Sequence, residues 1–430
     1  MLNKKSLYTV LATDLTHDGD GVAHIDELVV FVPGLLPGEK ASVRLTKIKK
    51  TFAHADLVEL IKPSPFRVDP PCPYFHECGG CSLQHLTYSA QLDVKRNTLN
   101  QALRRIGHFE GVNALPMVGM DNPYRYRSKV QFQVQDYHLG FFAKKSKRLV
   151  KIKDCLLIPG DMTVLKGQIE QVLHDHELLV ERVVIKKSVT EKHRMVIFYG
   201  EVPGSSHLKR IKIMAEELKN VSSLIWMDTK EHKYYHLAGE DSIEEEILGY
   251  RFRISPLAFM QVNHAQMQAM YAYVLNKTSL TKEDQALDLY CGMGSLTCHI
   301  AKIAKHVIGV EMVHSAIRDA ELNARINKLE NVDFILGTVE EVLPKGLPED
   351  FHADIIFLDP PRAGVDSASL QSVLQVLPRE IVYISCNPST LARDLAILCH
   401  AGQYALQDVQ PFDMFPQTMH TETVVFLERK

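Results

Sequence analysis

The 430-residue sequence predicts a Rossmann-like, doubly wound α/β sheet in its last part, preceded by a small β-barrel and a mixed α+β region. Three observations support this prediction. Apolar strand-like runs alternate with helix-like segments after about residue 256, turns rich in glycine divide short β-rich runs near the start, and prolines mark a linker at residues 63–71. We therefore expect three domains, at residues 1–62, 63–255 and 256–430.

The first two domains differ in regularity. The β-rich runs of the first cover residues 7–15, 27–32, 40–45 and 55–61, and five or so short strands of this kind close most simply into a small barrel. In the middle domain we expect a helix at about residues 90–106 and strands at 129–135 and 181–185. The acidic run at residues 241–246 is most simply a solvated face.

The last domain has the pattern of a parallel sheet. Its apolar runs cover residues 285–290, 306–311, 332–336, 353–359, 380–385 and 423–427. Helix-like segments, such as residues 296–305 and 314–327, separate most of these runs, as a doubly wound sheet requires.

Composition and charge limit the class of protein. Apolar residues make up 46% and charged residues 23%, which is ordinary for a globular chain. The first residues lack a secretory apolar run and no stretch reaches membrane-spanning length, so we expect a cytoplasmic protein without a membrane partner. Net charge is only −3, but residues 95–153 hold 13 Lys plus Arg against 3 Asp plus Glu, a local net of +10. Such a concentration favours a nucleic-acid partner.

A glycine loop follows the first strand of the last domain. Asp288-Leu289-Tyr290-Cys291-Gly292-Met293-Gly294-Ser295 leads into a helix, and Glu311 ends the next strand, where it can accept hydrogen bonds from ribose hydroxyls. The third glycine of a dinucleotide fingerprint and the Lys-Ser/Thr of a P-loop are both missing. The loop therefore favours S-adenosylmethionine, with Tyr290 beside the ligand, over a nicotinamide or a nucleoside triphosphate. A tight turn without a ligand is the alternative.

Two further groups end later strands of this sheet. Asp359-Pro360-Pro361-Arg362 follows the fourth strand, and Cys386 follows the fifth within Ser385-Cys386-Asn387-Pro388. Both should face the ligand crevice. Asp-Pro-Pro also occurs where adenine amines are methylated, and the prolines alone can form a rigid turn. Cys386 precedes a helix that should begin near Ser389, and a helix amino end favours the thiolate.

A thiol at this edge fits one chemistry well. C5 of uracil is a poor nucleophile until a thiolate adds to C6, and a base must afterwards remove the C5 proton. We assign Cys386 as the nucleophile and Glu422, in the run His420-Thr421-Glu422, as the base; a surface glutamate is the alternative for Glu422. Cytosine C5 methylation often uses two cysteines, and this half of the chain has no second Pro-Cys motif, so uracil is favoured.

The amino-terminal half contains a cysteine cluster and a basic aromatic run. Spacing alone allows zinc or an iron–sulfur cluster at Cys72, Cys78, Cys81 and Cys155. The run Tyr124-Arg125-Tyr126-Arg127-Ser128-Lys129 mixes rings with cations, as phosphate neutralisation and base stacking require. We predict that Arg125, Arg127 and Lys129 contact RNA. The run Lys144-Lys145-Ser146-Lys147-Arg148 either adds to this surface or is only a solvated face.

These motifs together resemble the 23S rRNA (uracil-5-)-methyltransferases, within the wider RNA 5-methyluridine methyltransferase family. The likeness runs through nearly the whole chain and adds Phe259-Met260-Gln261-Val262-Asn263 to the motifs above. It implies that the amino-terminal barrel is a TRAM module, which is an OB-like RNA-binding barrel. It also implies a class I methyltransferase domain and S-adenosyl-L-methionine as the methyl donor. Finally, it implies a 4Fe-4S cluster on the four cysteines, with a structural role.

The resemblance assigns further roles to residues. Gln261, Tyr290, Gly292, Glu311 and Asp359 would contact the donor or lie beside it, and Phe259 would pack near the flipped uridine. Two donor-side positions depart from the commonest form of the family. Ser295 stands where the family often has asparagine, and Thr338 stands where it often has asparagine or aspartate. The combination of TRAM module and cluster is most like enzymes of the U1939 site of 23S rRNA, and no obligate protein partner is evident.

Several rivals remain open from the sequence. A dual-site rRNA enzyme or a tRNA T-loop enzyme would share these motifs. A non-catalytic rRNA-binding assembly factor would keep the fold without needing Cys386, Glu422 or Gly292. Adenine N6 methylation would need Asp359-Pro360-Pro361 but no thiol.

Overall fold

The computed structural model describes residues 2–191, 193–202, 204–218 and 220–430. The chain divides into two compact units. Unit 1 consists of Met1–Asn97, Phe141–Val150 and Phe415–His420, and unit 2 consists of Thr98–Gly140, Lys151–Met414 and Thr421–Lys430. Two short segments from far along the chain therefore complete unit 1.

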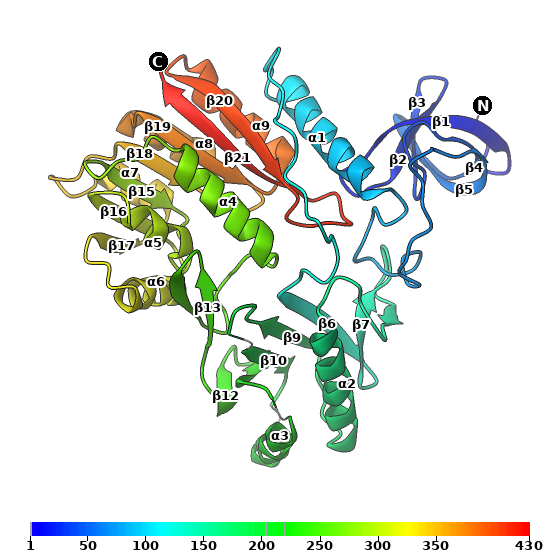
Figure 1. The fold of residues 1–430 in the computed structure, drawn as a ribbon. Helices are drawn as coiled ribbons and strands as arrows, with labels where there is room; N and C mark the ends of the chain where they lie inside the picture. The colour runs from blue at the N-terminus through cyan, green and yellow to red at the C-terminus, as the bar shows by residue number, and fades with distance from the viewer. Residues whose placement is uncertain (1, 192, 203, 219) are drawn as a thin grey trace. The chain divides into compact units, whose positions relative to one another are not determined.

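Unit 1 contains a closed five-stranded barrel in the order β1-β2-β3-β5-β4 (Figure 1). Its strands are β1 (Leu7–Leu15), β2 (Gly21–Ile25), β3 (Leu28–Val32), β4 (Lys40–Ile48) and β5 (Phe52–Lys62). Side chains alternate between the core and solvent along β4, which places Ala41, Val43 and Leu45 inside. The expected barrel is confirmed. The prediction lacked β2 because this strand is only five residues long and directly follows a glycine turn.

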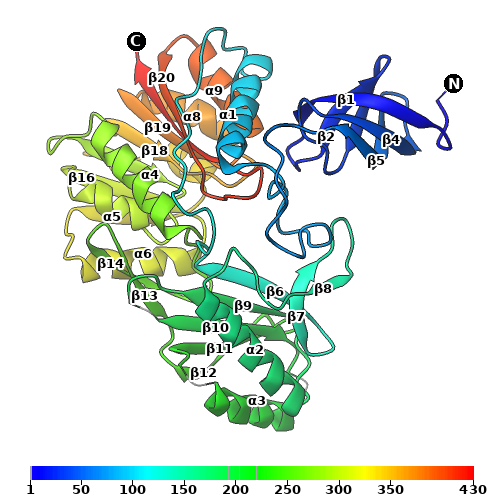
Figure 2. The same ribbon diagram turned by 45° about the vertical axis from the view of Figure 1, so that its right-hand side comes forward.

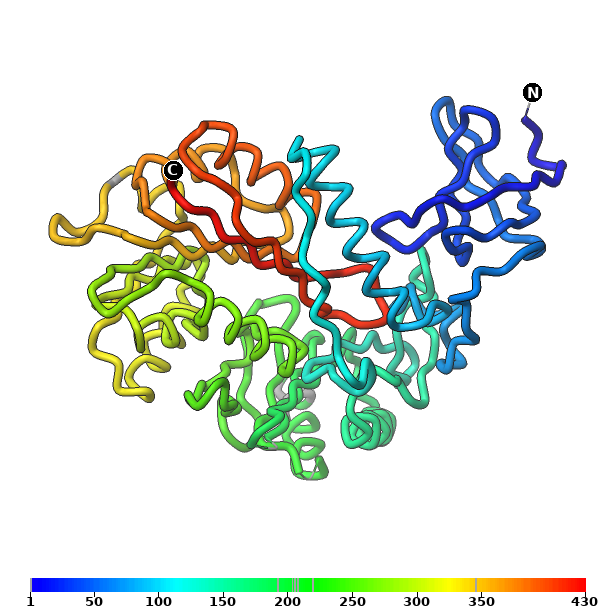
Figure 3. Tube along the Cα trace, turned by 45° about the horizontal axis from the view of Figure 1, so that its top comes forward, coloured from blue at the N-terminus to red at the C-terminus, as the bar shows by residue number. Residues whose placement is uncertain are grey.

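The remainder of unit 1 is a cysteine-bearing segment and the first half of α1 (Tyr88–Arg105). The segment Phe415–His420, red in Figure 3, lies beside α1, cyan in the same view. Backbone N–H groups of Ser82 and Leu83 both donate to the carbonyl oxygen of Gln417 at 3.0 Å. Helix, cysteine segment and distant loop are therefore hydrogen-bonded to one another.

A seven-stranded mixed sheet has the order β12-β11-β10-β9-β6-β7-β8 (Figure 2). Its strands are β6 (Lys129–Gln135), β7 (His138–Phe142), β8 (Leu149–Lys151), β9 (Arg182–Lys187), β10 (Arg194–Gly200), β11 (Ser223–Asp228) and β12 (Tyr234–Gly239), and the accompanying helices are α2 (Gly160–Asp175) and α3 (Ser205–Glu217). Trp226, the one tryptophan of the sequence, is fully buried in this sheet and stacks on Phe198 with ring centroids 5.8 Å apart.

In the acidic run at residues 241–246, Asp241, Glu244 and Glu246 are exposed as expected, but Glu245 is not. The run enters the hairpin of β13 (Ile243–Ile247) and β14 (Tyr250–Ile254), and Glu245 is fully buried there. Its carboxylate accepts hydrogen bonds from the backbone N–H groups of Val189 and Thr190 and from the Thr190 hydroxyl. A buried charge is tolerated when donors satisfy it in this way.

The last part of the chain forms a second seven-stranded sheet in the order β17-β16-β15-β18-β19-β21-β20 (Figure 1). Its strands are β15 (Gln285–Leu289), β16 (His306–Glu311), β17 (Val332–Leu336), β18 (Ile355–Leu358), β19 (Glu380–Ser385), β20 (Tyr404–Phe412) and β21 (Glu422–Arg429). The helices are α4 (His264–Lys277), α5 (Ser295–Ala301), α6 (His314–Ile326), α7 (Val339–Lys345), α8 (Ser367–Val376) and α9 (Pro388–His400).

Two sets of helices accompany this sheet: α4 contacts α5 and α5 contacts α6, while α7 contacts α8 and α8 contacts α9 (Figure 1). Apolar residues from β15, β16, β18, β19 and from α8 and α9 form one buried core. The first five strands of the sheet pair in parallel, and β21 pairs antiparallel with both β19 and β20. The predicted doubly wound sheet is confirmed, with an antiparallel edge that the prediction did not include.

Candidate active site

Four parallel strands and one antiparallel strand bring five polar residues to one edge of this sheet. Asp288 lies in β15, Glu311 ends β16, Asp359 follows β18 and Cys386 follows β19. Because β21 runs in the opposite direction, its first residue, Glu422, starts at the edge where β19 ends. Parallel strands present their ligand site at this carboxyl edge. The sequence prediction placed Asp359 and Cys386 at a common edge, and the structure does so too.

The glycine loop after β15 has a conformation that leaves room for a ligand. Tyr290, Gly292 and Gly294 all have positive φ, at 67°, 56° and 77°. A positive φ is uncommon for tyrosine, so the surrounding contacts must hold the turn in this conformation. A Cβ added at Gly292 would meet no atom within 4 Å, whereas at Gly294 it would press on Ala320 at 3.1 Å. Open space therefore lies beside Gly292, and Gly294 packs the loop against α6.

Glu311 ties this loop to the next strand. Its carboxylate accepts hydrogen bonds from the backbone N–H of Gly292 at 3.2 Å and of Val313 at 2.8 Å. Each carboxylate oxygen still has acceptor capacity, so Glu311 can also receive two hydroxyl groups of a ribose. The pattern of glycine loop, open space and acceptor at the adjacent strand end fits a nucleoside-bearing ligand such as S-adenosylmethionine.

Two aspartates at this edge have strongly raised pKa values. Burial raises the pKa of Asp288 to about 7, although the Thr297 hydroxyl donates to its carboxylate at 2.6 Å and partly opposes this shift. Burial also raises the pKa of Asp359 to about 7. A cation bound between such groups would favour their ionised forms. The pair therefore suits a ligand that carries positive charge, as a sulfonium does.

The ladder between β19 and β21 sets the relation of Cys386 to Glu422. Ser385 pairs with Thr423 and Ile384 with Val424 in an antiparallel register. The same register continued by one residue places Cys386 opposite Glu422. Glu422 is 3% exposed, and its charge influences the thiol. Nucleophile and base are thus adjacent on neighbouring strands, which the sequence could only predict as two residues of one domain.

The expectation of a lowered thiol pKa is wrong. Helix α9 does begin directly after Cys386, with the Asn387 side chain accepting a hydrogen bond from Ser389 N–H at 3.1 Å. Burial nevertheless raises the pKa of Cys386 to about 11, the carboxyl groups of Glu422 and Asp359 act in the same direction, and the Arg362 guanidinium opposes them. The resting thiol is therefore protonated at neutral pH.

The candidate base, Glu422, also has a strongly shifted pKa. The pKa of Glu422 lies well above its ordinary value, first because of burial and second because of the nearby Asp359 carboxyl. A carboxylate with a raised pKa is a stronger base once ionised. A shift of this size, with a specific charged neighbour, is typical of a functional site.

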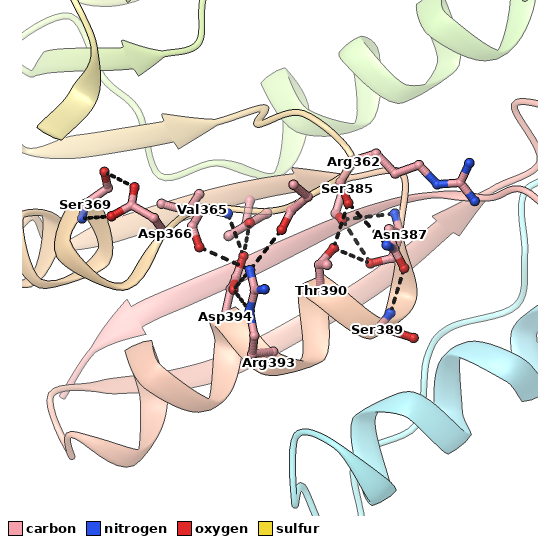
Figure 4. A network of polar contacts seen from close by, with 12 residues as sticks. Arg362, Val365, Asp366, Ser369, Ser385, Asn387, Ser389, Thr390, Arg393 and Asp394 are labelled. Atoms are coloured by element: carbon pink, nitrogen blue, oxygen red, sulfur yellow. Dashed lines mark hydrogen bonds and ion pairs between the residues drawn. The ribbon is translucent and has the colours of Figure 1, made fainter.

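A hydrogen-bond network fixes the turns that carry Asp359 and Cys386 (Figure 4). The backbone carbonyl of Arg362 accepts from the Asn387 amide at 3.2 Å and from the Thr390 hydroxyl at 3.3 Å. The Ser385 hydroxyl bonds to Asn387 backbone in both directions, as acceptor at 3.2 Å and donor at 3.3 Å. The loop after β18 and the turn after β19 are therefore fastened together.

Asp394 anchors the other end of this network, and the sequence reading missed it. Its fully buried carboxylate accepts from Val365 N–H at 2.9 Å, the Tyr383 hydroxyl at 2.7 Å and Arg393 at 2.7 Å (Figure 4). A Cβ at Gly364 would lie 2.5 Å from this carboxylate, so the loop needs glycine there. An aspartate on the apolar face of α9 was the signal that could have found it.

The remaining donor-side candidates occupy different kinds of position. Gln261 is buried, at 6% exposure, and Phe259 two residues earlier is 67% exposed. The hydroxyl of Ser295 at the start of α5 lies 2.9 Å from the Tyr271 hydroxyl. Thr338 is the N-cap residue of α7, and its side chain makes no capping hydrogen bond. Gln261 and Phe259 thus share one loop, and Ser295 and Thr338 follow the strands β15 and β17.

The four cysteines predicted as cluster ligands are half-buried. Cys72, Cys78 and Cys81 belong to unit 1 and Cys155 to unit 2. The backbone N–H of Gly80 donates to the Cys78 sulfur at 3.4 Å. Within the described part of the chain, no three His, Cys, Asp or Glu side chains are gathered as a metal site.

The predicted RNA-binding cations differ in their surroundings. The Arg125 guanidinium forms an ion pair with Asp154, with N–O distances of 2.7 and 2.6 Å, and also donates to the carbonyl oxygens of Cys155 and Ile158. The Arg127 guanidinium lies 6.0 Å from the Tyr126 ring centroid. Lys129 starts β6, and burial lowers its pKa. Arg125 is thus largely engaged within unit 2.

This fold and edge define a class I methyltransferase domain that follows a small barrel. Comparison with known families identifies both parts. The TRAM domain model matches residues 4–58, and the tRNA (uracil-5-)-methyltransferase model matches residues 87–430. The chain therefore belongs to the tRNA (uracil-5-)-methyltransferase family, and it is an S-adenosylmethionine-dependent RNA (uracil-5-)-methyltransferase.

Relatives and a solved structure agree with this assignment. An uncharacterized RNA methyltransferase of Halalkalibacterium halodurans is 37% identical over 451 residues, which covers 100% of this chain and 98% of that protein. One of Staphylococcus epidermidis is 36% identical over 455 residues, covering 100% and 99%. The Pyrococcus abyssi tRNA (uracil-54, C5)-methyltransferase, solved with S-adenosyl-L-homocysteine, has a TM-score of 0.78 and 25% identity, covering 98% of this chain and 100% of that one.

The described helices include none that is both long and apolar enough to cross a membrane.

Proposed function

We propose that this enzyme methylates C5 of a uridine in 23S rRNA, most like the U1939 site, through a covalent bond between Cys386 and C6 of the base. The observation that carries the proposal is the ladder register, which sets a buried carboxyl group, Glu422, opposite the thiol. C5 methylation needs both groups within reach of one uracil ring: the thiol adds at C6, and the carboxylate removes the proton from C5.

The proposed reaction proceeds in four steps. The Cys386 thiolate adds to C6, and the electron pair of the C5–C6 double bond makes C5 enolate-like. C5 then forms a bond to the methyl group that a bound sulfonium donor would supply, and the sulfur–methyl bond breaks with its electron pair on sulfur, which leaves as a neutral thioether. The Glu422 carboxylate takes the C5 proton. The C6–S bond breaks, the double bond re-forms and the thiolate is regenerated.

The other residues at the edge hold ligands in this proposal. Glu311 would accept the ribose hydroxyls, Gly292 would let the ligand approach the backbone, and Tyr290 would lie beside it. Asp359 would balance the positive charge of the donor, because its raised pKa falls when a cation approaches. Gln261, Ser295 and Thr338 would complete the donor side, and Phe259 would pack on the target uridine.

A trapping experiment tests the covalent step. RNA that contains 5-fluorouridine at the target should form an irreversible complex in the presence of the donor, because fluorine cannot leave C5 as a proton. Denaturing electrophoresis and mass spectrometry would show the adduct on the peptide that contains Cys386. The matched controls are the same RNA with uridine and the Cys386→Ala variant, which should give no stable adduct. Methyl transfer by Cys386→Ala at the wild-type rate would refute the mechanism.

A tRNA T-loop uridine is the second candidate substrate. The Pyrococcus abyssi structure of a tRNA (uracil-54, C5)-methyltransferase, which matches nearly the whole of this chain, favours it. A dual-site rRNA enzyme is the third. Mapping 5-methyluridine in 23S rRNA and tRNA from a deletion strain distinguishes the three, because loss should be confined to one rRNA site, two rRNA sites or the T-loop. No loss in either RNA would favour the non-catalytic assembly factor.

We also propose a 4Fe-4S cluster on Cys72, Cys78, Cys81 and Cys155. The family resemblance and the presence of four cysteine sulfurs as possible ligands support it, and the N–H···S hydrogen bond at Cys78 is of the kind that stabilises a thiolate. Anaerobic purification followed by iron, sulfide and zinc analysis tests it. Four irons and four sulfides per chain are expected. Stoichiometric zinc without visible absorbance would reject the cluster.

A further inference from the structure

The loop between β14 and α4 presents apolar side chains to solvent. Leu257 is 55% and Phe259 67% exposed, while Gln261 in the same loop is 6% exposed. Exposed large apolar side chains on an irregular loop do not stabilise that loop by burial. Another part of the protein must therefore hold its backbone in place.

Lys186, in β9 of the central sheet, supplies that support. It is 6% exposed, and its Nζ donates to the backbone carbonyl oxygens of Ser255 at 3.3 Å, Pro256 at 2.8 Å and Ala258 at 2.9 Å. An ammonium has three N–H donors, so the three carbonyls use all of them. All three belong to the four residues that immediately precede Phe259.

The far end of the loop is held from the neighbouring strand. Ser128, directly before β6, donates to the Val262 carbonyl oxygen from its backbone N–H at 2.7 Å and from its hydroxyl at 3.1 Å. Strands β6 and β9 pair with each other, with Lys129 opposite Lys186. The central sheet therefore fixes both ends of the loop, and Phe259 to Gln261 lie between the two attachments.

The energetics of Lys186 argue for a role beyond stability. No carboxylate of the described residues forms an ion pair with its Nζ; Asp319, whose charge it feels, bonds to the Ser255 hydroxyl instead. Burial lowers the pKa of Lys186 to about 7, so its ammonium form carries a desolvation cost that an apolar side chain of similar length would not have. A methionine would fill the same space but could not hold three carbonyls. The lysine thus specifies the shape of the loop.

We infer that Lys186 is a positioning residue for the methylation reaction: it fixes the backbone at Ser255 to Ala258 so that Phe259 projects toward the target uridine. The inference rests on the proposed function, which assigns Phe259 to that base. Lys186 acts through the loop and touches neither substrate nor donor in this scheme.

A double-mutant cycle between Lys186 and Phe259 tests the inference. Lys186→Met should lower kcat/KM for RNA by about 10- to 100-fold, since a small misplacement of a binding group can have an effect of this size. Phe259→Ala should cause a similar loss. In the Phe259→Ala background, Lys186→Met should have little further effect, because both act on the same contact. Additive losses would show a general structural role and overturn the inference.

The neighbouring lysine provides a matched control. Lys187, next along β9, forms ion pairs with Asp161 instead of contacting the loop. Lys187→Met should leave kcat/KM within about twofold of the wild type. Hydrogen exchange should quicken for the amides of residues 257–262 in Lys186→Met and not in Lys187→Met. Equal exchange in both variants would contradict the inference.

Folding is monitored separately through Trp226, which is buried in the sheet that contains β9. If its fluorescence shows that Lys186→Met is unfolded, Lys186→Gln replaces it in the cycle, and loss of folding in both variants would assign Lys186 to stability and reject the inference. Lys186→Arg, which keeps charge and donors, should recover part of the activity. If the wild type itself neither methylates RNA nor forms the 5-fluorouridine adduct, the proposed function is wrong. If the wild type is active and Lys186→Met has the same kcat/KM, only the positioning role of Lys186 is wrong.

Discussion

At the scale of single residues, burial favours the protonated forms of Cys386 and Glu422, although both residues must be deprotonated to act in the proposed reaction. Burial raises the pKa of Cys386 to about 11 and the pKa of Glu422 well above its ordinary value. Both must lose a proton before the thiol can add to C6 and the carboxylate can accept the C5 proton. A protonated resting thiol also resists oxidation, since the thiolate is the reactive form.

This protonation predicts the pH dependence of adduct formation. Because the thiol pKa is about 11, the thiolate fraction rises about tenfold per pH unit throughout the range below it. The single-turnover rate of adduct formation with 5-fluorouridine RNA should therefore increase from pH 6.5 to 9, with no plateau near pH 8. Rapid quench-flow measurements at constant ionic strength would test this pH dependence, with RNA affinity measured in parallel. A plateau near neutral pH would mean that substrate or donor binding has already lowered the thiol pKa.

At the scale of elements, strand order positions the site and loops complete it. The alternation of strands and helices predicted β15, β16, β18, β19 and β21, and with them the edge where Asp288, Asp359 and Cys386 meet. Sequence reasoning failed where contacts between distant segments determine the position or burial of a residue. It could not place Glu422 opposite Cys386, because antiparallel register depends on pairing and not on local pattern. It also took Glu245 for a solvated residue, since a buried carboxylate depends on donors elsewhere in the chain.

One such long-range interaction fixes the segment before Glu422. The buried Gln91 of α1 donates to the Gln417 side chain at 3.0 Å and accepts from the Gln417 backbone N–H at 3.2 Å. Gln417 has φ of 70°, which other contacts must maintain. Lys95, one turn further along α1, donates to the carbonyl oxygens of Phe415 and His420 at 3.1 and 3.0 Å. His420 is two residues before Glu422 in the sequence.

We predict that Gln91→Leu lowers kcat more than it raises KM for RNA. The change leaves the Gln417 backbone N–H buried without its acceptor, which costs roughly 1–3 kcal/mol and loosens the segment that leads to Glu422. Steady-state kinetics with saturating donor would measure both constants. Gln101→Leu, on the same helix, is the matched control and should change neither. An unchanged kcat in Gln91→Leu would show that the base does not depend on this clamp.

At the scale of the whole molecule, charge is distributed very unevenly. The net charge is −3, yet residues 95–153 have a local excess of +10 (13 minus 3). The predicted RNA-binding cations differ in whether their side chains are already bound within the protein. Arg125 is bound to Asp154, which raises the pKa of the guanidinium further and lowers the pKa of the carboxyl group. An arginine neutralised within the protein contributes little to phosphate binding, so its main effect should be on the segment of Cys155, whose carbonyl oxygen it also holds.

Salt dependence separates the two roles. For single-stranded RNA, the slope of log affinity against log salt falls by about 0.7 for each phosphate that the protein no longer neutralises. Arg127→Gln and Lys129→Gln should each weaken RNA binding and reduce the slope by about that amount. Arg125→Gln should leave the slope nearly unchanged and instead lower the melting temperature, because it removes the cation paired with Asp154 and one donor each from the carbonyl oxygens of Cys155 and Ile158. Fluorescence anisotropy at several salt concentrations, with thermal melts of the same proteins, would decide. A reduced slope with an unchanged melting temperature for Arg125→Gln would show that this arginine leaves Asp154 to meet the RNA backbone.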